Sequence, residues 1–154
     1  MVQVGFRKPS TGVATGKKYV ELLRVGANAT AAKMLPGIFV IKDTNDRSVK
    51  ESGAAGKVIG VLGYEDTPEA FRPTTRDTAY ALGDTVAVIH GQGAYVRALQ
   101  AASQTTVKGE TMKVVADGYL EIGTPGTDDI VAVAEESVTT DEGVTAAIWV
   151  TLRI

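Results

Sequence analysis

The chain has 154 residues, a formal net charge of −2 and no cysteine. This length suits one domain with a sizeable hydrophobic core, and the lack of cysteine excludes disulfides and zinc–thiolate sites. The near-neutral charge argues against nucleic acid as a partner, because proteins that bind DNA or RNA carry a basic field. No apolar run reaches the length of a membrane span and the N-terminus lacks a signal-peptide core. We therefore expect a soluble protein made in the cytoplasm, with no membrane partner.

Residues 1–18 are predicted to form an extended arm that becomes ordered only against a partner. The segment contains Gly5, Pro9, Gly12 and Gly16 and few large apolar groups, so it cannot bury enough surface to order itself. Residues 19–154 are expected to form a single β-rich domain. The apolar and cationic side chains of the arm and of its junction with the domain are the expected partner-binding residues: Phe6, Arg7, Lys8, Lys17, Lys18 and Tyr19.

Strand signals recur along the rest of the chain. The predicted strands, in order, are Tyr19–Val25, Ile38–Lys42, Val58–Tyr64, Thr85–Ile89, Tyr95–Leu99, Thr111–Ala116, Tyr119–Ile122 and Ala146–Ile154. Glycines at 91 and 93 predict a hairpin between the fourth and fifth of these strands, and Asp117-Gly118 predicts one between the sixth and seventh. Helix signals are weak and are limited to a short turn within Asn28–Leu35. Val131–Glu136 is ambiguous, although its valines favour a strand.

The C-terminal strand has the clearest pattern. Ile148, Val150, Leu152 and Ile154 share one face, which is the period of two typical of a strand with one face on a core. The opposite face carries Trp149, which is predicted to pack on a loop or at a subunit interface. Many short strands joined by glycine-rich turns predict a mainly β fold, a compact β-barrel or β-sandwich with little helix.

A weak internal similarity links Leu82–Val88 with Val107–Val114, since each contains a Gly-acid turn that leads into a strand. A duplicated β unit is one explanation. Reuse of the same turn chemistry is the explanation we favour, because glycine followed by an acid is common at turns.

No motif predicts catalysis, a cofactor or a metal. The only histidine is His90, beside a turn glycine, and no serine lies in a G-x-S-x-G elbow. The segments around Gly16-Lys17 and Gly56-Lys57 lack the other residues of a phosphate-binding loop. Asp43–Arg47 begins like an EF-hand loop, but Arg47 and Ser48 stand where a ligand and the turn glycine belong, so it is predicted to be a polar turn. We therefore expect no enzyme activity.

Three stretches carry a resemblance to a known family. They are Gly26–Val40 with its Lys33-Met34-Leu35-Pro36-Gly37 run, Gly60–Glu65 with the sequence Gly-Val-Leu-Gly-Tyr-Glu, and Asp117–Val150 with Ile130-Val131-Ala132-Val133-Ala134-Glu135-Glu136 before a final apolar strand. Together they resemble the capsid decoration, or cement, proteins of tailed viruses. Glu135 departs from this pattern, because the family often has an apolar residue there.

The resemblance implies a compact β fold on the exterior of the virion. The protein would bind the major capsid protein at junctions between its subunits, associate with itself as a homotrimer and reinforce the shell. Two other functions remain open from the sequence. One is a tail-tube or neck subunit, which would form six-fold rings. The other is a carbohydrate-binding module on the virion surface, whose binding would depend on Trp149.

Overall fold

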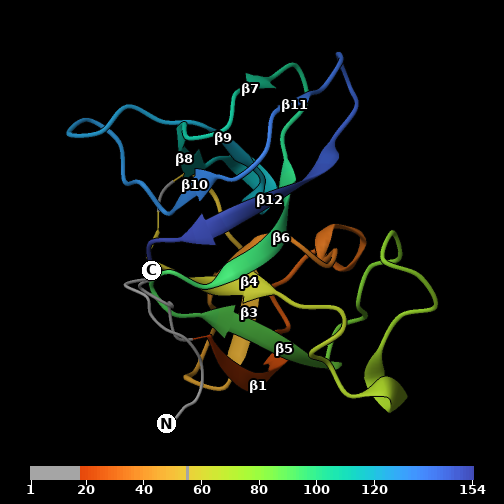
Figure 1. The fold of residues 1–154 in the computed structure, drawn as a ribbon. Coiled ribbons are helices and arrows are strands. Elements are labelled where there is room, and N and C mark those ends of the chain that lie inside the picture. The colour runs from red at the N-terminus through yellow and green to blue at the C-terminus, as the bar shows by residue number, and fades with distance from the viewer. Residues whose placement is uncertain (1–17, 55) are drawn as a thin grey trace, which may run out of the picture.

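The computed structural model describes residues 18–54 and 56–154, and these form two closed five-stranded barrels (Figure 1). Barrel 1 lies in the lower half of that view and barrel 2 in the upper half. The strands of barrel 1 are β1 (Tyr19–Val25), β2 (Phe39–Lys42), β3 (Ser48–Glu51), β4 (Val58–Leu62) and β5 (Thr85–His90). The strands of barrel 2 are β6 (Tyr95–Gln100), β8 (Thr111–Val114), β9 (Leu120–Ile122), β10 (Ala132–Ala134) and β12 (Ala146–Leu152).

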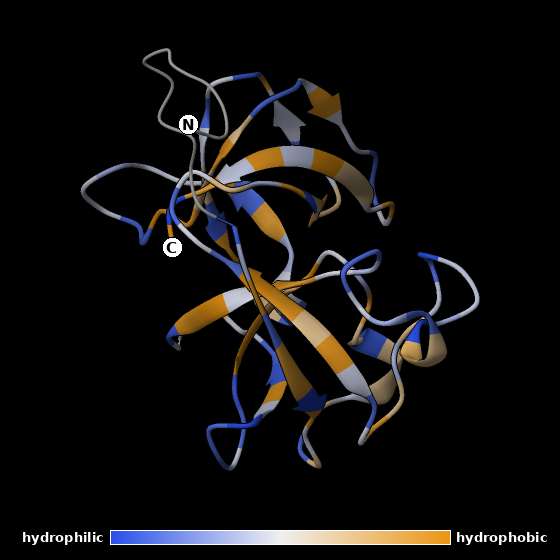
Figure 2. Ribbon diagram, turned by 60° about the horizontal axis from the view of Figure 1, so that its bottom comes forward, coloured by the Kyte–Doolittle hydropathy of each residue, from blue (hydrophilic) through white to orange (hydrophobic). Residues whose placement is uncertain are grey.

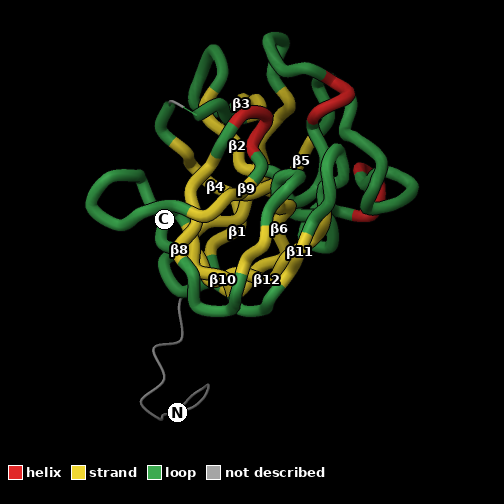
Figure 3. The backbone as a smooth tube through the Cα atoms, turned by 90° about the horizontal axis from the view of Figure 1, so that it is seen from above, coloured by secondary structure: helices red, strands yellow, loops and turns green. Residues whose placement is uncertain are grey.

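The remaining elements are short. Strands β7 (Thr105–Thr106) and β11 (Val138–Thr139) pair in a small two-stranded sheet. Single helical turns occupy η1 (Ala31–Lys33), η2 (Glu69–Phe71) and η3 (Ala116–Gly118), which Figure 3 shows in red among long green loops. The predicted mainly β fold with little helix is confirmed, and its architecture is a barrel.

The two barrels have the same topology. In barrel 1 the ring order is β1-β3-β2-β4-β5, and in barrel 2 it is β6-β9-β8-β10-β12. In each ring the first strand in the sequence pairs in parallel with the third and antiparallel with the fifth. The second strand pairs with the third and the fourth, and the fourth pairs with the fifth. The chain therefore repeats one structural unit.

Matching hydrogen bonds fix the alignment of the two units. In barrel 1 the Gly37 N–H donates to the Leu62 carbonyl at 2.8 Å, and in barrel 2 the Gly109 N–H donates to the Ala134 carbonyl at 2.8 Å. Both glycines adopt a positive φ, 100° and 96°, two residues before the second strand of their barrel. Only glycine adopts such angles at little cost, so both units start this strand with the same turn.

The similar segments noted in the sequence do not align in this duplication. Leu82–Val88 leads into the fifth strand of barrel 1, whereas Val107–Val114 leads into the second strand of barrel 2. Their likeness is thus reuse of a turn, and both turns hold a positive-φ glycine, Gly83 and Gly109.

Alternating apolar side chains fill each barrel, and this alternation is visible as orange and paler bands along the strands in Figure 2. In β12 the predicted core face is buried, with Ile148, Val150 and Leu152 at 0% exposure, while Trp149 on the opposite face is 40% exposed. The period-two interpretation of the C-terminal strand is confirmed, since one face of a strand at a barrel wall points inward.

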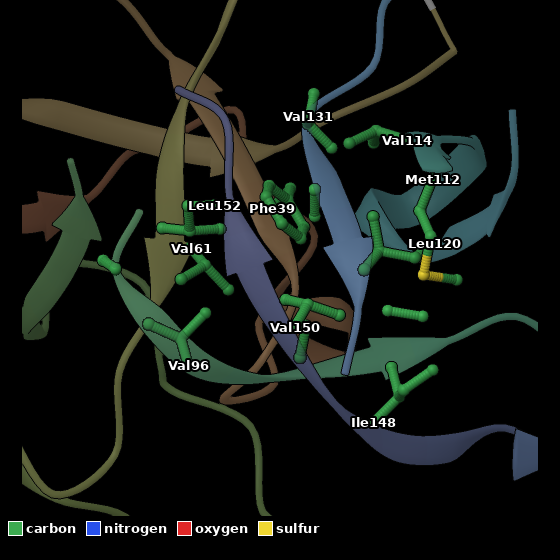
Figure 4. Packing of buried hydrophobic residues seen from close by; sticks show 14 of the residues in the cluster. Phe39, Val61, Val96, Met112, Val114, Leu120, Val131, Ile148, Val150 and Leu152 are labelled. Carbon is green, nitrogen blue, oxygen red and sulfur yellow. The ribbon is translucent and has the colours of Figure 1, made fainter. Parts of the chain in front are cut away.

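The outer face of barrel 1 contributes to the core of barrel 2. Phe39 and Val61 pack in one cluster with the side chains that fill barrel 2 (Figure 4), and Ile89 belongs to the same cluster. The neighbouring residues Val40, Leu62 and Val88 belong instead to the cluster inside barrel 1. A backbone contact accompanies this packing, because the Leu99 N–H of β6 donates to the Gly37 carbonyl at 3.0 Å. The core of barrel 2 is therefore shared with the outer face of barrel 1, while the side chains inside barrel 1 form a second cluster.

Most predicted strands are present within a residue or two of their predicted bounds, and the β8–β9 hairpin forms as predicted. The predicted hairpin between Thr85–Ile89 and Tyr95–Leu99 is wrong, because β5 pairs with β1 and β4 whereas β6 pairs with β9 and β12. The intervening glycines instead bond to the end of the chain: the Gly91 and Gly93 N–H groups donate to the carbonyls of Ile154 and Leu152. This turn connects two barrels rather than two paired strands.

Candidate functional site

A cleft of about 250 Å³ lies between the two barrels. Its barrel 2 wall is the outer face of β6 and β12, and its barrel 1 wall is the start of the loop between β4 and β5. The lining side chains that carry aromatic rings or charges are Lys18, Tyr64, Glu65, Asp66, Arg76, Tyr95, Arg97 and Trp149. Ligand sites often form where two units of a protein meet, so this cleft is the first candidate site.

The barrel 2 wall presents a pair of stacked rings. Tyr95 and Trp149 lie on neighbouring antiparallel strands with ring centroids 4.9 Å apart and ring planes at 26°. The tyrosine is 59% exposed and the tryptophan 40% exposed. Each ring packs on the other and still shows surface to solvent, which is the arrangement in which aromatic side chains bind a partner with little loss of conformational freedom.

Arg97 lies directly across from Trp149 in the register of β6 and β12. Its side chain is half-buried, and within the described part of the chain its guanidinium has no hydrogen-bond or ion-pair partner. Burial and the nearby positive charge of Arg76 lower the pKa of Arg97, which the acids Asp77 and Glu136 partly oppose. An unpaired guanidinium in such a position favours an anionic ligand, because a carboxylate would restore the interactions lost on burial.

The barrel 1 wall holds a second arginine against an aromatic ring. The Arg76 guanidinium lies 5.3 Å from the centre of the Tyr64 ring and pairs with Glu65 at 2.6 Å. Asp66 pairs with Lys18 at 2.8 Å. This wall therefore alternates cations and carboxylates, unlike the other wall, where Arg97 is the one charged side chain among the described residues that line the cleft.

Buried hydrogen bonds hold this wall in place. Thr67 and Tyr80 are buried, and their hydroxyl groups lie 2.9 Å apart. The Tyr80 hydroxyl donates to the Gly63 carbonyl at 2.7 Å, and the Ala87 N–H of β5 donates to the Thr67 hydroxyl at 3.0 Å. Burial raises the pKa of Tyr80. The network anchors both ends of the loop to β5, which positions Tyr64 and Glu65 on the cleft.

A second surface feature is the open edge of β1. Strand β3 pairs with β1 only at Arg24 and Val25, so on that side no described strand pairs with the segment from Val20 to Leu23. Val20 and Leu22 are 43% and 45% exposed there. Beside the edge lies a groove of about 610 Å³ lined by Leu22, Leu23, Arg24, Asn45, Arg47, Ser48 and Thr85.

The comparison with solved structures found similar chains, among them a bacteriophage protein. The chain is similar to the N base of head fiber gp8.5 of bacteriophage phi29, with a TM-score of 0.49 and 11% identity, over 88% of this chain and 94% of that chain. No protein-family model matches, and the search of curated proteins gave no match. These comparisons assign the chain to no family.

The residues predicted from the sequence fall in three places. Phe6, Arg7, Lys8 and Lys17 lie outside the described residues. Lys18 and Trp149 both line the cleft, where the lysine pairs with an acid of the same chain. Tyr19 stacks on His90 across β1 and β5, with ring centroids 5.5 Å apart.

The sequence analysis missed most of the cleft. Tyr64, Arg76, Tyr95 and Arg97 were not predicted as site residues. The first two come from the loop between β4 and β5 and the other two from β6, and these elements meet only through the packing of the barrels. One signal was available for two of them: Tyr95 and Arg97 alternate with apolar residues along a predicted strand, which places them on its outer face.

Asp43–Arg47 forms the turn between β2 and β3, as predicted, with an ion pair between Lys42 and Asp46 at 2.9 Å. A search of the described residues found no group of three or more histidines, cysteines or acids placed to hold a metal ion. In the same part of the chain, no helix has the length and apolar character that crossing a membrane requires.

Proposed function

We propose that the chain is a structural protein of a tailed-virus virion that binds the exterior of the capsid at junctions between major capsid protein subunits and stabilises the shell. The proposal combines the family resemblance of the sequence with one structural observation, the open apolar edge of β1. Self-association as a homotrimer belongs to the same proposal.

The edge of β1 has the properties of a strand-docking surface. An unpaired strand edge offers free N–H and C=O groups to another chain, and such edges bind partners by adding a strand to the sheet. The backbone groups of Leu23 and Val25 point toward β5, as the bond from the Val25 N–H to the Asp84 carbonyl shows. Those of Val20 and Leu22 therefore point to the open side, together with two exposed apolar side chains.

The charges beside the edge indicate the chemistry of the partner. Arg24 and Arg47 line the adjacent groove, so an extended partner segment with apolar and acidic side chains would be complementary. The predicted arm, residues 1–18, ends directly before β1, so arm and edge would bind neighbouring parts of the same surface. Two linked contacts of this kind hold more tightly than either alone, because the second acts at a high effective concentration.

The energetics require both contacts. Ordering the arm costs roughly 1–2 kcal/mol per residue of backbone entropy, and an exposed ion pair returns only about 0–1 kcal/mol. Completing the burial of Val20 and Leu22 would contribute about 1 kcal/mol each, since full burial of such side chains is worth roughly 1.5–3 kcal/mol. Apolar contacts of the β-rich domain, residues 19–154, therefore have to supplement those of the arm.

Co-sedimentation with purified capsids of the virus that encodes the chain tests the proposal. We expect deletion of residues 1–18 to leave the β-rich domain folded and to weaken its binding to capsids. Val20→Ser combined with Leu22→Ser should weaken binding roughly tenfold or more, which corresponds to about 1.4 kcal/mol. The matched control is Val107→Ser with Val144→Ser, two valines that are 55% and 54% exposed elsewhere on the surface.

Unchanged capsid occupancy in both the deletion and the β1 variant would refute the proposal. Six-fold rings in negative-stain images of the purified protein would instead favour a tail-tube or neck subunit.

A further inference from the structure

The duplication shows which features of the cleft the fold itself does not need. The Gly63 N–H donates to the Ala87 carbonyl and the Glu135 N–H donates to the Trp149 carbonyl, both at 2.9 Å and both directly after the fourth strand of a barrel. Trp149 therefore corresponds to Ala87. At this position one barrel has the methyl group of Ala87 and the other has the indole of Trp149. Because both barrels close, barrel closure does not explain the indole.

The same comparison applies to the arginine. Arg97 faces Trp149 across β6 and β12, and Leu22 faces Ala87 across β1 and β5. Arg97 thus corresponds to Leu22, an apolar residue. A half-buried guanidinium without a hydrogen-bonded partner lowers stability relative to such a residue, which indicates that this side chain serves a ligand rather than the fold.

The stacked pair offers a site for a ring. The two aromatic side chains, Tyr95 and Trp149, together form an apolar platform with polar tips, and the cleft beside it holds about 250 Å³. This volume is near the lower end of ligand pockets, roughly 300 Å³. It therefore suits one small ring unit of a longer ligand, with one face packed on aromatic carbon.

The charges of the cleft restrict the ring further. Arg97 presents a planar fork of donors that matches a carboxylate. Across the cleft, Glu65 and Asp66 each have two carboxylate oxygens, and each group uses one of them in its ion pair. The remaining oxygens accept hydrogen bonds from hydroxyl groups. A ligand with a flat apolar face, several hydroxyls and one carboxylate satisfies all of these groups.

We infer that the cleft between the barrels binds an acidic saccharide, with a sugar ring on the Tyr95–Trp149 platform and its carboxylate on Arg97. Single-stranded nucleic acid also stacks on aromatic side chains. However, Glu65 and Asp66 face the site and the chain has a net charge of −2, both of which oppose a chain of phosphates. The inference goes beyond the proposed capsid binding, because the cleft and the groove beside β1 share no lining residue.

Two binding experiments test this site on the full chain. The first is a glycan array that carries uronic-acid and sialic-acid glycans beside their neutral counterparts, with a dT oligonucleotide as an added probe. We expect binding to at least one acidic class, at least tenfold tighter than to its neutral counterpart. The second is calorimetric titration with the acidic glycan that binds.

The variants Arg97→Gln and Trp149→Ala should each weaken binding of this glycan at least tenfold, while the melting temperature stays close to that of the parent. Matched controls are Arg153→Gln and Phe71→Ala, an exposed arginine and an exposed phenylalanine away from the cleft. Both controls should keep the parent affinity within about twofold.

Three results would overturn the inference. One is equal binding, or none, of acidic and neutral glycans. Another is tighter binding of the oligonucleotide than of any glycan. The last is a Trp149→Ala protein whose mass in solution falls to a smaller oligomer while glycan binding is unchanged, because a second subunit would then be the occupant of the platform.

Discussion

Phe39→Ala is the sharpest test of whether the two barrels unfold as one unit. The side chain has 0% exposure, starts β2 of barrel 1 and packs with the side chains that fill barrel 2. Truncating a buried phenylalanine costs about 3–5 kcal/mol, since apolar contacts are lost and a cavity remains. For a chain of this size each kcal/mol lowers the melting temperature by roughly 2–4 °C, so we expect a fall of roughly 6–20 °C.

Differential scanning calorimetry measures both the shift and the number of transitions. We expect one transition in the parent and one in the variant, because the shared core couples the barrels. Phe71→Ala is the control: this phenylalanine is 48% exposed in η2, and surface substitutions of this kind stay within about 0.5 kcal/mol. Two transitions, of which Phe39→Ala moves only one, would refute the shared core, and so would a shift as small as that of the control.

Two further predictions concern the same architecture. Gly118→Ala should destabilise the chain by more than about 1 kcal/mol in urea denaturation, because Gly118 has a φ of 84° and a Cβ there would collide with the Phe39 carbonyl. Gly126 has the same φ but open space around it, so Gly126→Ala measures the backbone contribution alone. Equal destabilisation by the two variants would disprove the collision. The Thr124 N–H and Lys113 lower the pKa of Asp128, so its contribution is present at neutral pH and is lost as the pH falls below about 4. The stability difference between the parent and Asp128→Asn should therefore shrink in acid, and a difference independent of pH would contradict this.

Much of the local structure could be predicted from the sequence, because strand periodicity and turn glycines act over a few residues. The C-terminal strand, with Trp149 on its outer face, follows directly from its period of two. Strand β3 was missed because Ser48–Glu51 has one apolar residue, Val49, and owes its pairing to its neighbours. The erroneous hairpin has a related cause: the turn chemistry at Gly91–Gly93 encodes a turn and not the partner of the strand that follows.

The candidate site could not be predicted for the same physical reason. A cleft between two barrels depends on Phe39, Val61 and Ile89 packing outward onto barrel 2, and in the sequence these residues look like ordinary strand residues. The duplication was also hidden, since the two units agree in hydrogen bonds and topology while their side chains differ. Fold signals in a β protein are largely apolar alternation, which leaves the outer faces free to diverge.

That divergence separates stability from function within a single chain. Where the two units carry the same feature, as with Gly37 and Gly109, the backbone of the barrel requires it. Where they differ at aligned positions, the fold accepts both residues, so the reason for the unusual one lies outside the fold. Trp149, which aligns with Ala87, and Arg97, which aligns with Leu22, are differences of this second kind. Replacing both with the residues at the aligned positions of barrel 1, by Trp149→Ala with Arg97→Leu, should therefore give a chain that melts as cooperatively as the parent. The only property it should lose is binding of the ligand in the cleft.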